Sequence, residues 1–343
     1  MGHKTTIQDV ANSLNLSRAT VSKVLNNAPG VSDDTRQAVL ARIQEMNYKN
    51  TEQILIKTSK PARNPARNFA FLMHSRPDNL HIGSTIMTQL EQEIRKDGYS
   101  LTIHTITDED YTHMELPPNL YLDRTEAIIC LELFHEKYSQ LLCSLNLPVL
   151  FVDACSNFYN LGLKCDLLMM ENRFSVYQML TTLCNQHSLK TMGYFGDITH
   201  CLSFHERFEG FQLAALNCQV ITKPYHIIDS DYLYCSPDWI EDRIKKMEQL
   251  PQLFFCANDV LASNLILVLD KLGYQIPKDI LVCGFDGIPT NNPIIYNLIT
   301  VRTPSTELGT IAAQLLKQRI QNPKTISTST YLRTEILYRN TTS

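Results

Sequence analysis

The sequence predicts an N-terminal all-α helix-turn-helix domain followed by a larger α/β body built on two doubly wound parallel sheets. Two observations lead to this prediction. Residues 1–50 contain three short segments with helical periodicity and polar caps, whereas from residue 69 onward short apolar, β-rich runs alternate with amphipathic helical patterns. Such alternation is typical of parallel sheets covered on both faces. Because the strand-like runs are too numerous for one small sheet, we expect two lobes.

The first two helices are predicted from capping residues and apolar periodicity. Thr6 and Asp9 have the spacing of a capping box, and the apolar residues after Thr6 recur at intervals typical of one helix face. Asn15 tolerates the left-handed conformation of a tight turn, and Ser17 can cap a second helix that continues to Leu25. Two helices joined by so short a turn form a helix-turn-helix.

A third helix is predicted after the loop at residues 26–30. Ser32 is a typical cap residue, and Asp33 and Asp34 favour the positive end of a helix dipole. The inner face of this helix carries Val39, Ile43 and Met46. The three helices predict a small domain over residues 1–50.

Residues 51–68 are predicted to form a hinge or linker, because the segment is polar, basic and interrupted by Pro61 and Pro65. The body then covers residues 69–343. Its expected strands are 69–73, 101–105, 127–131, 149–152, 167–170, 191–195, 219–221, 253–256, 280–284 and 299–301. Its expected helices are 84–97, 173–185, 204–215, 237–249, 260–272 and 306–322.

The composition is that of a globular protein, with 343 residues and 44% hydrophobic side chains. Residues 1–8 contain no apolar signal region and no long apolar run follows, so we expect a cytoplasmic protein without a membrane partner. The 10 cysteines include no CxxC pair. We therefore expect reduced, structural thiols and neither a metal nor a cofactor.

Charge is distributed unevenly along the chain. The formal net charge is −4, yet residues 1–67 are net basic and residues 68–343 are net acidic. A basic end on an acidic body is expected where one end of a protein meets nucleic-acid phosphates.

Several sequence blocks carry a resemblance to a known family. They are Thr6-Ile7-Gln8-Asp9-Val10-Ala11, Ser17-Arg18-Ala19-Thr20-Val21-Ser22-Lys23-Val24-Leu25-Asn26, Arg207-Phe208-Glu209-Gly210-Phe211, Phe255-Cys256-Ala257-Asn258-Asp259 and Gly284-Phe285-Asp286. Together they closely resemble the lactose-repressor/galactose-repressor (LacI/GalR) family of bacterial regulators, from Thr6 to near Arg339.

The resemblance implies a body like that of periplasmic sugar-binding proteins, in which the chain crosses between lobes three times. The crossings are expected near residues 169–173, 296–300 and 322–327. Lobe 1 would then comprise about 69–170 and 299–323, and lobe 2 about 171–298 and 324–343.

The DNA-binding candidates lie at and around the second helix, whose N-terminal residues enter the major groove in a helix-turn-helix. Arg18 can bind guanine and Ala19 can contact a thymine methyl group. Ser17, Thr20 and Ser32 could contact phosphates or could only cap helices. The full candidate set is Thr6, Ser17, Arg18, Ala19, Thr20, Ser22, Lys23, Asn26 and Ser32.

The ligand-binding candidates follow predicted strands, because ligands of such sheets lie beyond the carboxyl ends of the strands. Asp153 and Asp286 occupy such positions, and the resemblance adds Arg207 and Asn258. The two added residues could instead be an internal ion-pair partner, for example of Glu206, and a turn residue. Asp259 is expected to cap the helix that follows it.

Three further candidates lie in the loop after the first strand of the body: His74, Arg76 and His81. Their chemistry favours an anionic or nucleoside-like ligand.

Two segments depart from the family pattern. In the hinge, Asn50 replaces a usual proline and Lys57 a usual leucine, which leaves open whether a hinge helix enters the minor groove. Glu171-Asn172 stands where the family usually has Asp-Asn.

The expected function is a ligand-responsive repressor that binds a palindromic operator as a homodimer, because half-site spacing mirrors two-fold protein symmetry. Its effector would be a sugar, sugar phosphate or nucleoside in the cleft between the lobes. A solute-binding protein or sensor with the same body but no operator role is the alternative. An enzyme is not expected, because no nucleotide, nucleophile or metal motif follows a strand.

Overall fold

The computed structural model describes residues 5–26, 28, 30–46, 48–49, 51, 54, 67–74, 80–223, 225–228, 236–288 and 297–339. The chain divides into two compact units, Met1–Arg67 and Asn68–Ser343. Among the described helices, none is long and apolar enough to cross a membrane.

The first unit contains the three predicted helices, α1 (Ile7–Ser13), α2 (Arg18–Leu25) and α3 (Asp33–Glu45). Thr6 and Asp9 form the capping box of α1, and the side chain of Ser17 accepts a hydrogen bond from the amide of Thr20. Asn15 adopts a left-handed conformation with φ of 54°. The core of the unit comprises Val10, Ala11, Val21, Val24, Leu25, Val39, Ile43 and Tyr48. The predicted helix-turn-helix is therefore confirmed.

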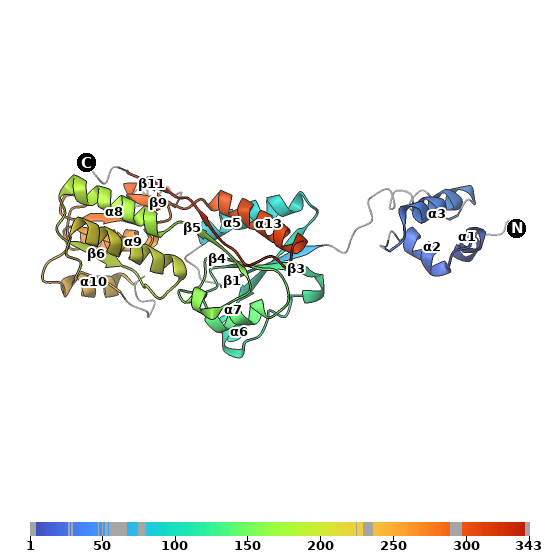
Figure 1. The fold of residues 1–343 in the computed structure, drawn as a ribbon, viewed down its shortest axis with the longest axis horizontal. Coiled ribbons are helices and arrows are strands. Elements are labelled where there is room, and N and C mark those ends of the chain that lie inside the picture. The colour runs from blue at the N-terminus through green and yellow to red at the C-terminus, as the bar shows by residue number, and fades with distance from the viewer. Residues whose placement is uncertain are drawn as a thin grey trace. The chain divides into compact units, whose positions relative to one another are not determined.

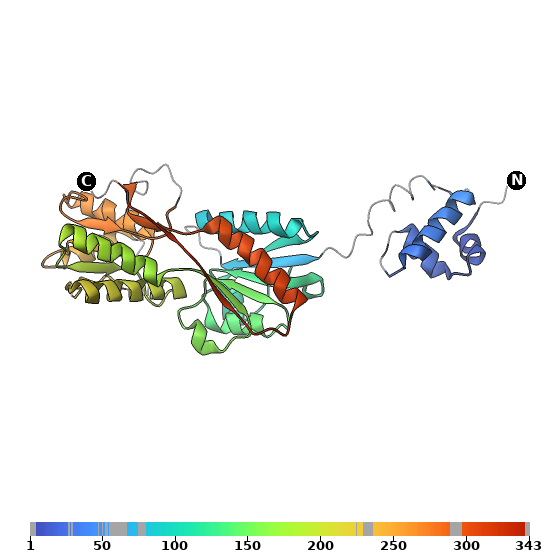
Figure 2. The same ribbon diagram turned by 45° about the horizontal axis from the view of Figure 1, so that its top comes forward.

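The first lobe of the second unit is built on a six-stranded parallel sheet of order β10-β5-β4-β3-β1-β2. Its strands are β1 (Asn68–His74), β2 (Ser100–Ile106), β3 (Thr125–Leu131), β4 (Val149–Val152), β5 (Asp166–Met170) and β10 (Ser329–Leu332). Helices α5 (Leu80–Arg95) and α13 (Ser305–Gln321) lie side by side on one face (Figures 1 and 2). The other face carries α6 (Asp108–His113), α7 (Glu136–Cys143) and the 3-10 helix η2 (Phe158–Leu161), which pack in one cluster with Ala70 and Leu72 of β1. A second 3-10 helix, η1 (Leu122–Arg124), directly precedes β3.

Strand β1 shows why this sheet is covered on both faces. Phe69 and Phe71 pack in the cluster that includes residues of α5 and α13. Ala70 and Leu72 point the other way, into a second cluster that contains Tyr138 of α7. Since side chains alternate along a strand, a continuous apolar run is buried only when both faces are covered.

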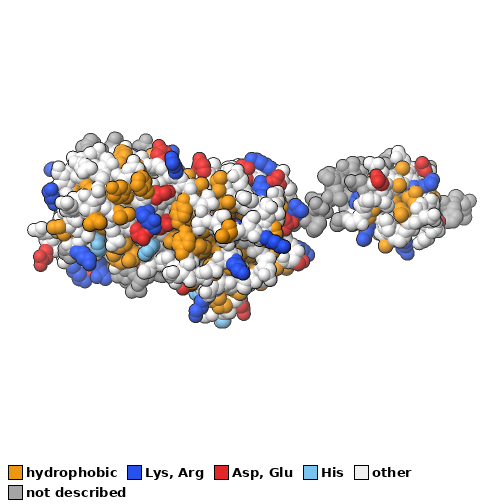
Figure 3. Space-filling view, viewed as in Figure 1, with side chains coloured by type: hydrophobic (Ala, Val, Ile, Leu, Met, Phe, Trp, Pro, Cys, Tyr) orange, Lys and Arg blue, Asp and Glu red, His pale blue; other side chains and the backbone are white. Residues whose placement is uncertain are grey.

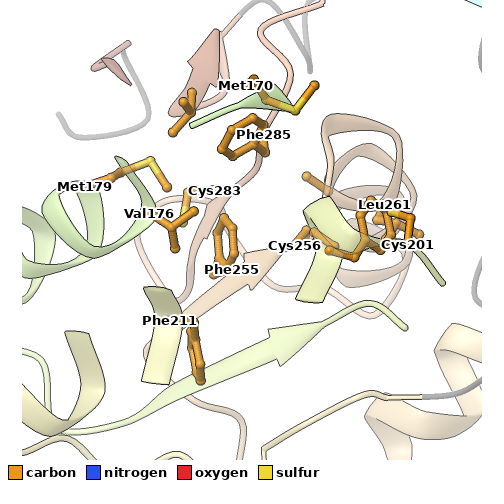
Figure 4. Packing of buried hydrophobic residues seen from close by; sticks show 14 of the residues in the cluster. Met170, Val176, Met179, Cys201, Phe211, Phe255, Cys256, Leu261, Cys283 and Phe285 are labelled. Carbon is orange, nitrogen blue, oxygen red and sulfur yellow. The ribbon is translucent and has the colours of Figure 1, made fainter. Parts of the chain in front are cut away.

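The second lobe is built on the parallel sheet β6-β7-β8, with strands Met192–Phe195, Leu253–Cys256 and Leu281–Cys283. An antiparallel pair, β9 (Thr300–Arg302) and β11 (Glu335–Leu337), lies beside β8. The helices of this lobe are α8 (Arg173–His187), α9 (Leu202–Cys218), α10 (Pro237–Lys245) and α11 (Asp259–Lys271). In its core, Val176 and Cys283 lie beside Phe255, with Phe211 beyond (Figure 4).

One predicted strand is wrong. Residues 219–221 form no strand, because Gln219 ends α9 in a left-handed conformation and Ile221 makes only an isolated bridge to Thr191. The other predicted strands and helices are present. Helices α6 and α7 and strands β10 and β11 were not predicted from the sequence.

The lobe boundaries also need correction. We placed residues 299–323 in the first lobe, but β9 at Thr300–Arg302 pairs with β11 and belongs to the second lobe. We placed residues 324–343 in the second lobe, but β10 pairs with β5 in the sheet of the first lobe. The second and third crossings therefore follow Arg302 and Leu332, and the first lies between Met170 and Arg173.

Candidate functional site

The first candidate surface is the N-terminal part of α2. Ser17 caps the helix, and its hydroxyl oxygen lies 2.8 Å from that of Thr20. Arg18, Ala19 and Lys23 are exposed, as is Asn26, which ends the helix. An exposed helix N-terminus presents free amides and the positive end of a dipole, which favour a phosphate.

The remaining DNA-binding candidates flank this surface. Thr6 is exposed and donates its hydroxyl to Asp9 in the capping box of α1. Ser22 is half-buried within α2, and Ser32 caps α3 by accepting a hydrogen bond from the amide of Thr35. Lys and Arg side chains are visible on the face of this unit shown in Figure 3. Capping thus accounts for part of the role of Thr6, Ser17 and Ser32, whereas the side chains of Arg18, Ala19 and Lys23 are exposed on α2.

The second candidate site is centred on Arg207 of α9, which is only 3% exposed. Its Nε donates to Oδ1 of Asn172 over 3.0 Å, and its Nη1 donates to the carbonyl oxygen of Ala257 over 2.7 Å. Its Nη2 lies 3.3 Å from Oδ1 of Asp286. The guanidinium also lies over the ring of Phe285, 3.7 Å from the centroid. Arg207 is thus held in one plane by four contacts.

Asp286 is placed by a strained turn directly after β8. Its φ is 114°, a conformation that residues with side chains rarely adopt and that clusters at functional sites. Its amide donates to the carbonyl oxygen of Val301 over 2.8 Å. Burial raises the pKa of Asp286 to about 6, while the charge of Arg207 acts in the opposite direction. The alternative partner of Arg207 that we considered, Glu206, does not form an ion pair with it.

Asp153 follows β4 in the first lobe, again with positive φ, 60°. Its Oδ2 accepts from the hydroxyl of Ser203 over 2.6 Å, and its Oδ1 accepts from the amides of Ala154 (2.8 Å) and Ser203 (3.2 Å). Cys201, the N-cap residue of α9, provides no side-chain cap. A carboxylate of the first lobe therefore caps a helix of the second lobe. Burial raises the pKa of Asp153, and the bond from Ser203 lowers it.

Asn258, and not Asp259, caps α11. Oδ1 of Asn258 accepts from the amide of Leu261 over 2.9 Å and caps α11. The prediction that Asp259 caps this helix is wrong. Asp259 is buried and accepts from the hydroxyl of Thr300 over 2.6 Å and from the amide of Ile288 over 3.2 Å. Burial, followed by the nearby Asp286, raises its pKa to about 7.

His74 lies at the end of β1, with Nε2 3.0 Å from Oδ1 of Asp108. Its ring stacks on Tyr111 at 4.9 Å, and Tyr111 stacks on His135 at 4.7 Å. Tyr111 and His135 were not among the ligand-binding candidates predicted from the sequence. Arg76 and the side chain of His81 lie outside the described residues, so the histidine and arginine loop stays a prediction.

Asn172 and Glu206 are two buried polar residues of this site that the sequence analysis did not propose as functional. Nδ2 of Asn172 donates to Oε2 of Glu206 over 2.8 Å, and the hydroxyl of Tyr331 donates to Oε1 of Glu206 over 2.6 Å. Burial raises the pKa of Glu206. The sequence did mark the position of Asn172, because Glu171-Asn172 stands where the family usually has Asp-Asn. No sequence pattern indicated a buried role for Glu206, since an acidic residue on an amphipathic helix is ordinarily exposed to solvent.

The arrangement suits a polar ligand. Asp153 and Asp286 supply carboxylate acceptors, Arg207 supplies donors, and Phe204 and Phe285 flank the guanidinium at 5.6 and 3.7 Å. Such a set matches the hydroxyl and amide groups of a small ring compound. Among the described residues, no group of three or more His, Cys, Asp or Glu side chains could hold a metal ion.

Two family models match the chain. Residues 6–50 match the bacterial regulatory proteins of the lacI family, and residues 183–342 match a periplasmic binding protein-like domain. The first match covers α1, α2 and α3, and the second covers most of the second lobe together with α13 and β10.

Curated relatives align over nearly the whole chain. The HTH-type transcriptional repressor PurR of Mannheimia succiniciproducens is 24% identical over 326 residues, which cover 92% of either chain. The PurR protein of Pasteurella multocida is 26% identical over 342 residues, also with 92% of each chain covered. The ribose operon repressor of Haemophilus influenzae is 22% identical over 93% of this chain and 92% of its own.

Solved structures share the fold. The lac repressor dimer bound to operator and the anti-inducer ONPF superposes with a TM-score of 0.68, with 20% identity and 99% of each chain covered. The complex of the transcriptional regulator CelR with cellobiose has a TM-score of 0.65 and 18% identity, over 98% of this chain and 100% of its own. With both family models, these similarities agree with the helix-turn-helix unit and the two parallel lobes described above. The lacI-type model at residues 6–50, the periplasmic-binding-protein-like model at 183–342 and the full-length similarity to named repressors together support a regulator of the LacI/GalR type.

Proposed function

We propose that this protein is a cytoplasmic, ligand-responsive transcriptional repressor that binds a palindromic operator as a homodimer and has no catalytic activity. The observation that carries the proposal is the presence, in one chain, of a lacI-type DNA-binding segment at residues 6–50 and a periplasmic-binding-protein-like domain at 183–342. A solute-binding protein does not require the DNA-binding segment, and a simple DNA-binding protein does not require the periplasmic-binding-protein-like domain.

On the DNA side, α2 would lie in the major groove with Arg18 and Ala19 at base edges and Lys23 near a phosphate. This assignment is supported by the exposure of these side chains and by the capped helix start that precedes them. Thr6, Ser17, Thr20, Ser22, Asn26 and Ser32 would complete the contact surface.

On the effector side, Arg207 and Asp286 would bind a small polar ring compound, a sugar, sugar phosphate or nucleoside, with Asp153, Asn258 and the first-lobe loop completing the site. The named relatives include a ribose operon repressor, and one structural neighbour holds cellobiose. A ligand that bridges the lobes would alter the angle between them and so the DNA affinity.

The DNA proposal is tested by selecting binding sequences from a random duplex library and measuring affinity as a function of salt. Arg18→Met should cost about 1 to 3 kcal/mol on the selected sequence and relax the preference at one base. Arg42→Met is the matched control, since Arg42 lies on α3 and pairs with Glu45. A protein that stays monomeric and selects no sequence would contradict the proposal.

The effector proposal is tested by thermal shift against ribose, cellobiose, sugar phosphates and nucleosides. A compound present at 100 times its Kd should stabilise the folded protein by about 2.7 kcal/mol. Arg207→Met should abolish that stabilisation, whereas Arg173→Met, on the exposed pair with Glu209, should retain it. If Arg207→Met folds and still responds fully, Arg207 is not an effector residue.

A further inference from the structure

Besides the carboxylate of Asp286, Arg207 has one acceptor that is not fixed by the backbone. The carbonyl of Ala257 is part of the chain, whereas the acceptor of the Nε–H group, Oδ1 of Asn172, belongs to an amide that can rotate. If that amide turned by half a revolution, its NH2 group would face the Nε–H group, and two donors would oppose each other. The presentation of Arg207 therefore depends on what holds the amide of Asn172.

The NH2 group of Asn172 has two acceptors. Nδ2 lies 2.9 Å from the carbonyl oxygen of Met170 and 2.8 Å from Oε2 of Glu206. Asn172 and Glu206 are 0% and 5% exposed, so water does not compete freely for these bonds. We infer that Glu206 is a positioning residue of the effector site, which fixes the amide of Asn172 and through it the orientation of Arg207.

The second oxygen of Glu206 extends this role to the connection between the lobes. Oε1 accepts from the hydroxyl of Tyr331 over 2.6 Å, and that hydroxyl lies 3.1 Å from the hydroxyl of Tyr159. Asn172 lies in the first crossing segment and Tyr331 on β10, just before the third. One carboxylate on α9 therefore binds two of the three connections between the lobes. A change in lobe angle that moves either segment also moves the acceptor of Arg207.

Arg173 makes its close ion pair with Glu209, 2.5 Å away, and its charge acts on Glu206 without a hydrogen bond between them. Glu206 thus acts through its two accepting oxygens. A glutamine can copy most of this: its oxygen can accept from Asn172 while its NH2 group donates to Tyr331, whose hydroxyl then donates to Tyr159. A methionine of similar length offers no hydrogen bond. The inference rests on the proposed role of Arg207, but its test requires neither effector nor DNA.

The test measures how fast phenylglyoxal labels Arg207 in the full-length protein, followed by peptide mass spectrometry. In Glu206→Met the labelling rate of Arg207 should rise about tenfold, because the amide of Asn172 is then held by the carbonyl of Met170 alone and the acceptor of the Nε–H group is less firmly oriented. Glu206→Gln should restore it to within about twofold of the wild type. The matched control is Glu209→Met on the same helix, which should speed the labelling of Arg173 but not of Arg207. Arg319, bound by Asp166 at 2.6 Å, is the internal reference.

A wild-type labelling rate of Arg207 in folded Glu206→Met would overturn the inference, as would a Glu206→Gln protein as reactive as Glu206→Met. If Arg319 becomes reactive together with Arg207, the Glu206→Met protein has lost its fold. The labelling rate of Arg207 in Tyr331→Phe is then the test of the inference. That variant removes one partner of Glu206 and should raise the Arg207 rate about two- to fivefold. An unchanged rate in folded Tyr331→Phe would overturn the inference, whereas absence of DNA or effector binding would bear on the proposed function alone.

Discussion

At the scale of single residues, the second lobe places two carboxylates, Asp259 and Asp286, at the carboxyl end of its sheet with one guanidinium, that of Arg207. Asp259 is fully buried and accepts hydrogen bonds from neutral donors, among them the hydroxyl of Thr300 and the amide of Ile288. Removing a carboxylate from water is costly unless a positive charge or a proton accompanies it. Asp286 has Arg207, whereas Asp259 has no such partner among the contacts given by the structure.

Protonation of Asp259 therefore links folding to pH. Its pKa is raised from 3.8 to about 7 in the folded protein, so between these values the folded state keeps a proton that the unfolded state has lost. Stability must then fall as pH rises across this range, by on the order of 1 to 3 kcal/mol, and level off above it. Asp259→Asn, which cannot ionise, should reduce this dependence in urea unfolding between about pH 4.5 and 8, while the raised pKa of Asp286 keeps part of it. An unchanged slope in Asp259→Asn, with exposed Asp242→Asn as control, would contradict this prediction.

The residue scale also shows where sequence reasoning succeeds and where it stops. Asp286 and Asp153 were predicted to follow strands, because a polar residue at the end of an apolar run is conspicuous, and the structure places them after β8 and β4; their binding of a ligand stays a prediction. The cap of α11 was assigned to Asp259 in place of Asn258, because both are good cap residues and the sequence does not show that Thr300 donates to Asp259. Glu206 was missed as a positioning residue because its partners, Asn172 and Tyr331, are 34 and 125 positions away in the sequence.

At the scale of elements, periodicity and capping predicted the helices and strands with strong local signals, including all three helices of the first unit. Helix α6 has only six residues and none of them is buried, so it has no apolar face to reveal it. Strands β10 and β11 are partly exposed and owe their conformation to distant partners, β5 and β9. The lobe boundaries failed for the same reason, since the crossing points depend on those pairings.

Close packing of α5 and α13 gives a prediction at this scale. A Cβ added to Gly309 would lie 2.6 Å from the carbonyl oxygen of Ile86 and 2.8 Å from Cβ of Gln89. Gly309→Ala must therefore push the helices apart, and we expect a loss of about 1 to 3 kcal/mol in free energy of unfolding. Gln314→Ala, at an exposed position of α13, should change it by less than about 0.5 kcal/mol. Equal stabilities of the two variants in urea titrations would show that the helices are not in this close contact.

At the scale of the whole molecule, the two units differ in charge as well as in fold. The basic residues 1–67 carry the exposed face of α2, and the acidic residues 68–343 carry the buried polar residues around Arg207. Phosphate contacts supply a sequence-independent attraction that depends on salt, whereas base contacts supply the sequence preference. Two cations on the same helix, Arg18 and Lys23, can therefore be assigned different tasks.

Lys23 lies in the last turn of α2, behind the residues expected at base edges, so it should neutralise a phosphate. Lys23→Met should weaken binding about equally on selected and random DNA and reduce the slope of log Kd against log salt by about one per protomer. Arg18→Met should instead weaken binding mainly on the selected sequence. Lys317→Met, in the acidic unit and paired with Asp97, should leave the slope unchanged. If Lys317→Met changed the slope as much as Lys23→Met, the body would share the DNA surface and the division of charge would not be a division of function.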